Sequence, residues 1–173
     1  MAPVEDLEDP RRSEPPYVLG ERAMLEAWLE FHRTTLLLKC EGLTAASSGR
    51  RPIASSALSL HGLVRHMAEV ERSWFRRTLE GDGDAPRIYG PSGGDADLAP
   101  LDDADWDVDL ATRHAECDVS RAIAARHDLD DTGPRRGRPC SLRWIYVHMI
   151  EEYARHNGHA DLLRELLDGE VGC

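Results

Sequence analysis

The chain has 173 residues, enough for one domain that buries roughly two thirds of its unfolded surface without help from disulfides or metals. Its 21 Lys and Arg residues face 32 Asp and Glu residues, and the net charge of −11 repels nucleic acid and acidic membrane surfaces. No apolar run approaches the length of about 18 residues that a membrane span needs, so we expect a cytoplasmic protein without nucleic-acid or membrane partners.

The N-terminal half predicts a tail and two helices. Residues 1–20 are acidic and proline-bearing without an apolar core segment, so we expect a flexible segment that is neither a signal peptide nor an anchor. Apolar residues recur at helical spacing over about residues 21–41, and Gly42 follows as a C-terminal cap. A second such pattern covers about residues 59–80 and also ends at a glycine, Gly81.

The C-terminal half predicts two more helices. About residues 103–126 show a narrower apolar face, with early acidic residues that suit a helix N-terminus. The longest pattern, about residues 141–168, can be capped by Ser141 and ended by Gly169. Strand alternation is absent, so the predicted fold class is all-α, a four-helix bundle in one domain over residues 21–170.

The connections between these helices are long. Residues 43–58 and 81–100 are rich in turn-forming residues, so the bundle need not have simple up-and-down neighbours, and the second loop could cross the bundle or cover a site. PRRGRP (134–139) is the one concentrated basic patch, which could meet an anionic ligand or be a solvated loop. The cysteines lack CxxC spacing and are interpreted as reduced thiols: Cys40, Cys117, Cys140 and Cys173.

Residues of a type that binds metals interrupt two apolar stripes. In the last helix, Glu152 and His156 stand four residues apart, so both side chains can reach one ion. In the second helix, His66 occupies a position where an aliphatic residue would be expected. A carboxylate that faces a core needs a cation or many donors, because burying it unpaired costs several kcal/mol. The three residues therefore predict a divalent-metal site between the second and fourth helices.

Spacing alone leaves alternatives open. His66 could be a hydrogen-bonded core histidine, and Glu152 could lie on a solvated face beside Glu151. Glu69 is interpreted as helix-surface charge. Four residues could replace or support a ligand or contact the substrate: His148, Arg155, His159 and Arg164. Four other histidines are expected at surface or boundary positions: His32, His61, His114 and His127.

Three stretches, residues 21–44, 60–81 and 141–169, resemble the DinB-like superfamily and within it the DUF664 branch. The resemblance covers about residues 15–170, and the string EEYARHNGHADLLRE is its most specific part. It implies a DinB-like four-helix bundle that holds zinc, nickel or another divalent ion. The implied ligands are one histidine of the second helix and two residues spaced by four on the last helix, here His66, Glu152 and His156.

The resemblance also implies a chemistry. Relatives that use mycothiol, including the mycothiol-dependent maleylpyruvate isomerase, are similar to this chain in having glutamate as the second ligand. A bound ion would deprotonate a coordinating thiol, although it could equally activate water. We therefore expect a metal-dependent thiol transferase in which mycothiol attacks an electrophilic small molecule. The alternatives are a metal-dependent hydrolase and a non-catalytic metal-binding or stress-response protein. A homodimer could form through an outer helix face.

Overall fold

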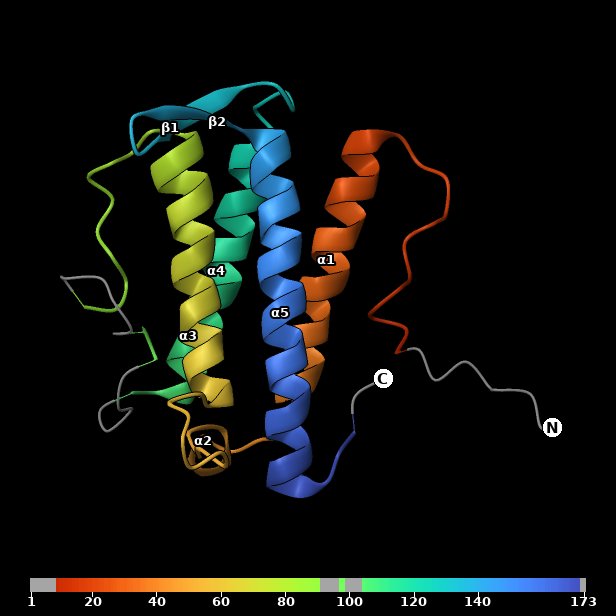
Figure 1. The fold of residues 1–173 in the computed structure, drawn as a ribbon, viewed down its shortest axis with the longest axis vertical. Helices are drawn as coiled ribbons and strands as arrows, with labels where there is room; N and C mark the ends of the chain where they lie inside the picture. The colour runs from red at the N-terminus through yellow and green to blue at the C-terminus, as the bar shows by residue number, and fades with distance from the viewer. Residues whose placement is uncertain (1–8, 91–96, 99–103, 172–173) are drawn as a thin grey trace.

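The computed structural model describes residues 9–90, 97–98 and 104–171, and its long helices form a bundle (Figure 1). The predicted all-α four-helix bundle is confirmed, and the helix ends fall close to the expected positions. The second helix begins as an α-helix and continues as a π-helix. The elements are α1 (Glu21–Cys40), α3 (Leu60–Glu71) with η1 (Arg72–Leu79), α4 (Trp106–Ala124) and α5 (Leu142–Asp168).

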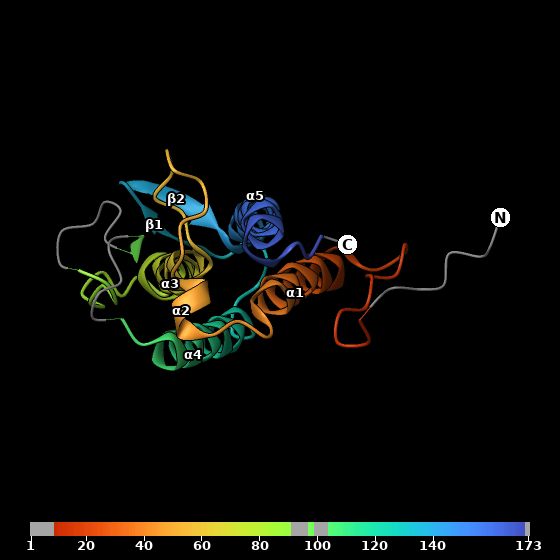
Figure 2. The ribbon, with the colours of Figure 1, turned by 90° about the horizontal axis from the view of Figure 1, so that it is seen from below.

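The helices do not follow an up-and-down order. Figure 1 shows α1 and α5 running in one direction while α3 and α4 run in the other. Seen end-on, α5 lies beside α1 and α3, whereas α4 lies on the opposite side of the bundle (Figure 2). Because α3 and α4 are parallel, the chain must return along the bundle between Leu79 and Trp106, which explains the long connection there.

The helix ends obey the capping rules that the sequence suggests. The Ser59 side chain accepts the N–H of Gly62 at 3.0 Å and starts α3. Ser141 does the same for α5 with the N–H of Trp144 at 3.2 Å. Gly169 ends α5 in the left-handed conformation, with φ of 82°, which glycine adopts without steric cost.

Apolar side chains from all the long helices fill the interior. Each fully buried aliphatic side chain contributes about 1.5–3 kcal/mol relative to an exposed one. This core holds α3 against α5 and so fixes the separation of the residues that face each other across them. Its fully buried members include Leu36, Leu63, Met67, Ile145, Met149 and Leu163.

A charged network lies inside this apolar core. The carboxylate of Glu71 accepts two hydrogen bonds from Arg33, at 2.8 and 2.6 Å, and one from the Tyr153 hydroxyl at 2.9 Å. Arg113 donates to the backbone carbonyl of Arg33 at 2.7 Å. The Glu71 side chain has no exposed surface, so its charge is stabilised by these donors rather than by water.

The expectation that strands are absent was wrong at one place. β1 (Thr132–Arg135) and β2 (Arg138–Ser141) form an antiparallel hairpin above the bundle. Its two-residue turn consists of Arg136 and Gly137, whose φ angles of 51° and 76° are those of a type I′ turn. Strands of four residues that contain prolines show too little alternation to be recognised in the sequence.

Glycine lets the hairpin lie directly on η1. A Cβ atom added to Gly133 would stand 1.8 Å from the carbonyl oxygen of Thr78, far inside van der Waals contact. Only a residue without a side chain fits this approach of two backbones.

Two polar residues expected at or near the surface are buried instead. His61 bonds to Asp109 of α4 at 2.7 Å. Glu69 accepts the backbone N–H groups of Ile88, at 2.8 Å, and Tyr89, at 3.4 Å, and so ties the following loop to α3. His61 and Glu69 are buried for the same reason: neighbouring segments cover α3 on more sides than they would cover a helix at the edge of the bundle. The other three histidines lie at exposed or partly buried positions, as predicted: His32, His114 and His127.

The remaining expectations concern the tail, the loops and the cysteines. Residues 9–20 contain no helix or strand, and Arg11 of this segment pairs with Glu41, while residues 1–8 lie outside the described part. The first long loop contains a one-turn helix, α2 (Ala45–Ser48). Cys173 also lies outside the described part, and the other three cysteines are free and buried. No helix in the described part has the length and apolarity to cross a bilayer.

Candidate metal centre

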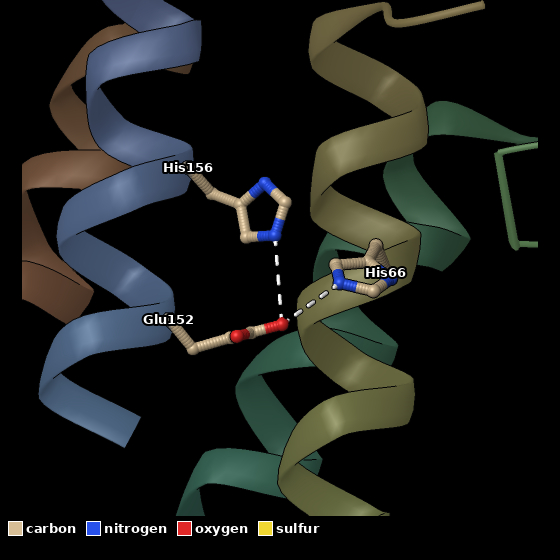
Figure 3. A group of neighbouring side chains, drawn as sticks. All are labelled: His66, Glu152 and His156. Carbon is tan, nitrogen blue, oxygen red and sulfur yellow. Dashed lines mark ion pairs between the residues drawn. The ribbon is translucent and has the colours of Figure 1, made fainter. Parts of the chain in front are cut away.

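The three predicted ligands meet between α3 and α5. Figure 3 shows His66 projecting from α3 toward Glu152 and His156, which extend from successive turns of α5. Each residue offers one ligand atom, and these atoms all lie within 4.8 Å of one another. Glu152 and His156 are neighbours on one helix, and the core packing that holds α3 against α5 brings His66 to them.

The distances between the ligand atoms suit a metal ion. Oε1 of Glu152 lies 3.5 Å from Nε2 of His66 and 3.6 Å from Nε2 of His156. Two ligand atoms that each lie about 2.0–2.2 Å from a tetrahedral ion are separated by about 3.4 Å. Two nitrogens and one carboxylate oxygen form a donor set typical of zinc sites that keep a position open for a reactant.

The free nitrogen of His66 is the clearest sign of a ligand site. Its Nε2 atom is buried and has no hydrogen-bond partner, although a buried polar atom is normally satisfied. Its Nδ1 atom bonds to Oδ2 of Asp97 at 2.6 Å, so in the neutral ring that a metal requires the proton would lie on Nδ1 and the lone pair of Nε2 would be directed away from Asp97. A carboxylate behind a histidine is a common arrangement at metal sites, where it fixes the ring and its tautomer.

The carboxylates of the centre favour a positive charge between α3 and α5. The imidazoles of His156 and His66 keep the pKa of Glu152 well below its ordinary value, despite partial burial of the carboxylate. Burial of His66 acts to lower its pKa, but the neighbouring carboxylates of Asp97 and Glu152 outweigh this effect and raise it to about 9. Glu152 is therefore ionised at neutral pH, and without a bound ion the protonated ring of His66 carries the positive charge beside it, so a metal ion that binds here would displace the proton on Nε2.

Three of the four supporting residues predicted from the sequence border the centre. Nε2 of His148 lies 4.0 Å from Oε2 of Glu152, and Nη1 of Arg155 lies 3.5 Å from the same oxygen. Nδ1 of His159 lies 3.4 Å from Nδ1 of His156. All three come from α5, so they follow from the same helical period as the ligands themselves.

Arg164 is placed differently. Its guanidinium donates to the backbone carbonyls of Lys39 and Glu41 at 2.8 Å and pairs with Asp168 and Glu170. These contacts satisfy carbonyl groups at the C-terminal end of α1, where a cation is favoured. The structure thus engages Arg164 in joining α5 to α1, and no role at the metal centre is assigned to it.

A second group of ligand-type side chains overlaps the first. His148, Glu151 and Glu152 also bring one ligand atom each within 4.8 Å of one another. Glu151 is exposed and forms an ion pair with Arg155, so its charge is already compensated. The buried, unpartnered nitrogen of His66 therefore favours the group of His66, Glu152 and His156.

Sequence reasoning did not find Asp97 or the aromatic residues beside the centre. Asp97 lies in the connection between η1 and α4, where no periodic pattern identifies a position. Trp74 lies within the helical pattern of residues 59–80, and the centroid of its ring lies 4.5 Å from that of His148. The Trp144 ring stacks on that of His148 with their centroids 5.0 Å apart, and the spacing of four residues on one helix is the signal that could have indicated this pair.

Comparison with known proteins gives one finding that bears on this centre. A family model described as mycothiol-S-transferase matches residues 24–169, a range that includes all but the first three residues of α1, the whole of the elements from α2 to α5, and all three candidate ligands. A search of curated proteins found no match.

Proposed function

The chain belongs to the mycothiol-S-transferase family, and from this we propose that it transfers mycothiol to an electrophilic small molecule at a divalent-metal centre. The proposed ligands are His66, Glu152 and His156. The observation that carries the metal centre is the buried Nε2 atom of His66, which has no hydrogen-bond partner and lies 3.5 Å from the Glu152 carboxylate. Zinc or nickel would suit this donor set.

Each residue of the proposed centre has a separate role in the reaction. A divalent ion bound there would lower the pKa of a coordinated thiol enough to supply thiolate near neutral pH. Asp97 holds the His66 ring in position, and Glu152 supplies the negative charge that retains a cation. The thiol loses its proton, its sulfur forms a bond to the electrophilic carbon, and the group displaced from that carbon leaves with the bonding electrons.

The three cysteines in the described part of the chain support an external thiol as the nucleophile. Burial raises the pKa of Cys40 to about 12 and that of Cys117 to about 11, and it also raises the pKa of Cys140. Since the thiolate is the reactive form, these side chains are poor nucleophiles at neutral pH. A cytoplasmic location is part of the proposal, because low-molecular-weight thiols stay reduced there.

The test measures metal content and thiol transfer together. After chelation and reloading with zinc or nickel, we expect about one ion per chain in the parent protein and a sharp loss in His66→Ala and Glu152→Gln. Transfer of mycothiol to 1-chloro-2,4-dinitrobenzene, followed as thioether formation, should fall more than about 100-fold in both variants. His114→Ala, at an exposed position of α4, is the matched control.

Two results would overturn this proposal. The first is a folded parent protein that takes up neither ion. The second is thioether formation that persists in both ligand variants. Consumption of a substrate without added thiol would instead identify the hydrolase alternative.

A further inference from the structure

Three arginines of the hairpin lack the partners that most arginines of this chain possess. Arg135, Arg136 and Arg138, here called the hairpin arginines, form no ion pair with a carboxylate in the described part of the chain. The charges that act on Arg135 include the like charges of Arg136, Arg77 and Arg87. A chain with net charge −11 offers many acidic partners, so an unpaired cationic cluster indicates attraction to an anion from outside.

The hairpin arginines line an open cavity of about 410 Å³ together with Trp144 and Ser141. Trp144 keeps 50% of its surface exposed, which is unusual for the largest apolar side chain. Its ring stacks on His148 with an angle of 18° between the planes. The exposed part of the indole remains available to a planar molecule, and the hairpin arginines line the same cavity.

A row of aromatic rings joins this cavity to the metal centre. His148 contacts Glu152 at one end of the row and packs against Trp74 and Trp144 at the other. The Arg135 guanidinium lies 4.2 Å from the centre of the Trp74 ring. Trp144 and Glu152 are eight residues apart on α5, which corresponds to a rise of about 12 Å. One elongated ligand can therefore reach both places.

The turn of the hairpin carries an arginine in a backbone conformation that this residue type rarely adopts. Arg136 has φ of 51°, a left-handed conformation in which asparagine, aspartate or glycine is usual. An arginine at this position adds a positive charge at the edge of the cavity at a steric cost.

We propose that this cavity binds the electrophilic substrate, and that the substrate is a planar organic anion whose ring stacks on Trp144 while its carboxylate pairs with the hairpin arginines. The proposal rests on the proposed function for the reaction at the other end of the ligand. It names the substrate class and assigns the arginines to specificity: an anionic group held at the hairpin, away from the reacting carbon, favours anionic electrophiles over neutral ones such as 1-chloro-2,4-dinitrobenzene.

Binding is tested on metal-free protein, so that the result does not depend on the metal centre. The probes are 2-naphthoate and its neutral analogue 2-naphthamide, measured by titration calorimetry at low ionic strength. We expect 2-naphthoate to bind about tenfold more tightly than the amide, as charge-assisted pairing with arginine implies. Arg138→Gln and Arg136→Gly should each remove most of that difference. Glycine tolerates the left-handed φ, so Arg136→Gly removes the charge without endangering the turn.

Arg50→Gln, at an exposed position before α3, is the charge-matched control and should bind both probes as the parent does. His66→Ala should also retain 2-naphthoate binding, because His66 does not line this cavity. This variant therefore separates a failure of the metal centre from a failure of the cavity. Equal affinity for acid and amide, or unchanged binding in both hairpin variants, would overturn the proposal. In the transfer reaction, Arg138→Gln should raise KM for anionic electrophiles; a raised KM for the thiol alone would assign the cavity to the thiol and contradict it.

Discussion

Nδ1 of His66 lies 2.6 Å from Oδ2 of Asp97, so a helix residue is oriented by a residue from the connection between η1 and α4. This contact leaves Nε2 of His66 free to face Glu152 and His156. The ring is held from outside the helix that carries it, and the position of this connection therefore matters to the candidate metal centre.

Removing the Asp97 carboxylate should weaken metal binding. We expect Asp97→Asn to reduce zinc affinity about 10–100-fold, because His66 loses the group that fixes its ring and raises its basicity. Competition with a chromophoric chelator measures the change. Asp84→Asn, an exposed residue of the same connection, is the control. Equal zinc affinity in Asp97→Asn and the parent would show that Asp97 does not support the centre.

The Glu71 carboxylate should be essential to stability. Glu71→Gln removes the carboxylate that pairs with Nε and Nη2 of the buried Arg33 guanidinium and leaves it the partly exposed Glu30, so the free energy of unfolding should fall by about 3–5 kcal/mol. Denaturant titration followed by circular dichroism gives this value. The exposed pair of Arg11 and Glu41 provides the comparison, because Glu41→Gln should cost less than about 1 kcal/mol. Similar losses in the two variants would contradict the role assigned to the network.

The same network predicts how stability depends on pH. Burial acts to raise the pKa of Glu71, but the charge of Arg33 and the hydrogen bonds of Arg33, Ser120 and Tyr153 lower it below 4.5. The unfolded chain therefore takes up a proton at this residue more readily than the folded one. Its stabilising contribution is complete above the unfolded pKa and is lost as the pH falls through the folded value.

Measurement of the free energy of unfolding between about pH 7 and pH 3 should show a decline that begins below about pH 5. The decline should be shallower in Glu71→Gln, which cannot titrate. Parallel curves for the two proteins would mean that Glu71 contributes no pH dependence.

No side chain should be tolerated at Gly133, where the hairpin contacts η1. Gly133→Ala would bring a methyl group into the carbonyl of Thr78, and the backbone must shift, at a cost of about 3 kcal/mol. Thermal unfolding measures this loss. Gly158→Ala, where a Cβ atom meets nothing within 4 Å, should instead be neutral or stabilise α5 by up to about 1 kcal/mol. A stable Gly133→Ala protein would show that the hairpin can detach from η1 without loss.

The sequence by itself determined the helices and three residues of the candidate centre. Helical periodicity is a local property, so it located the long helices and their caps, and it revealed His66, Glu152 and His156 as interruptions of apolar stripes. The structure brings those three side chains together. That they bind a metal stays a prediction, which the metal-content measurement addresses.

Only the tertiary structure decided which residues of different segments contact one another. The contact of Asp97 with His66 and the burial of Glu69 join segments far apart in the chain. No periodic pattern specifies such pairs, because they depend on the path of the connection between η1 and α4. The sequence did not predict the hairpin for a related reason. Its four-residue strands are too short to show alternation, and they are stabilised by packing on η1 through Gly133. Periodicity thus reveals which face of a helix is buried, whereas packing decides which neighbour buries it.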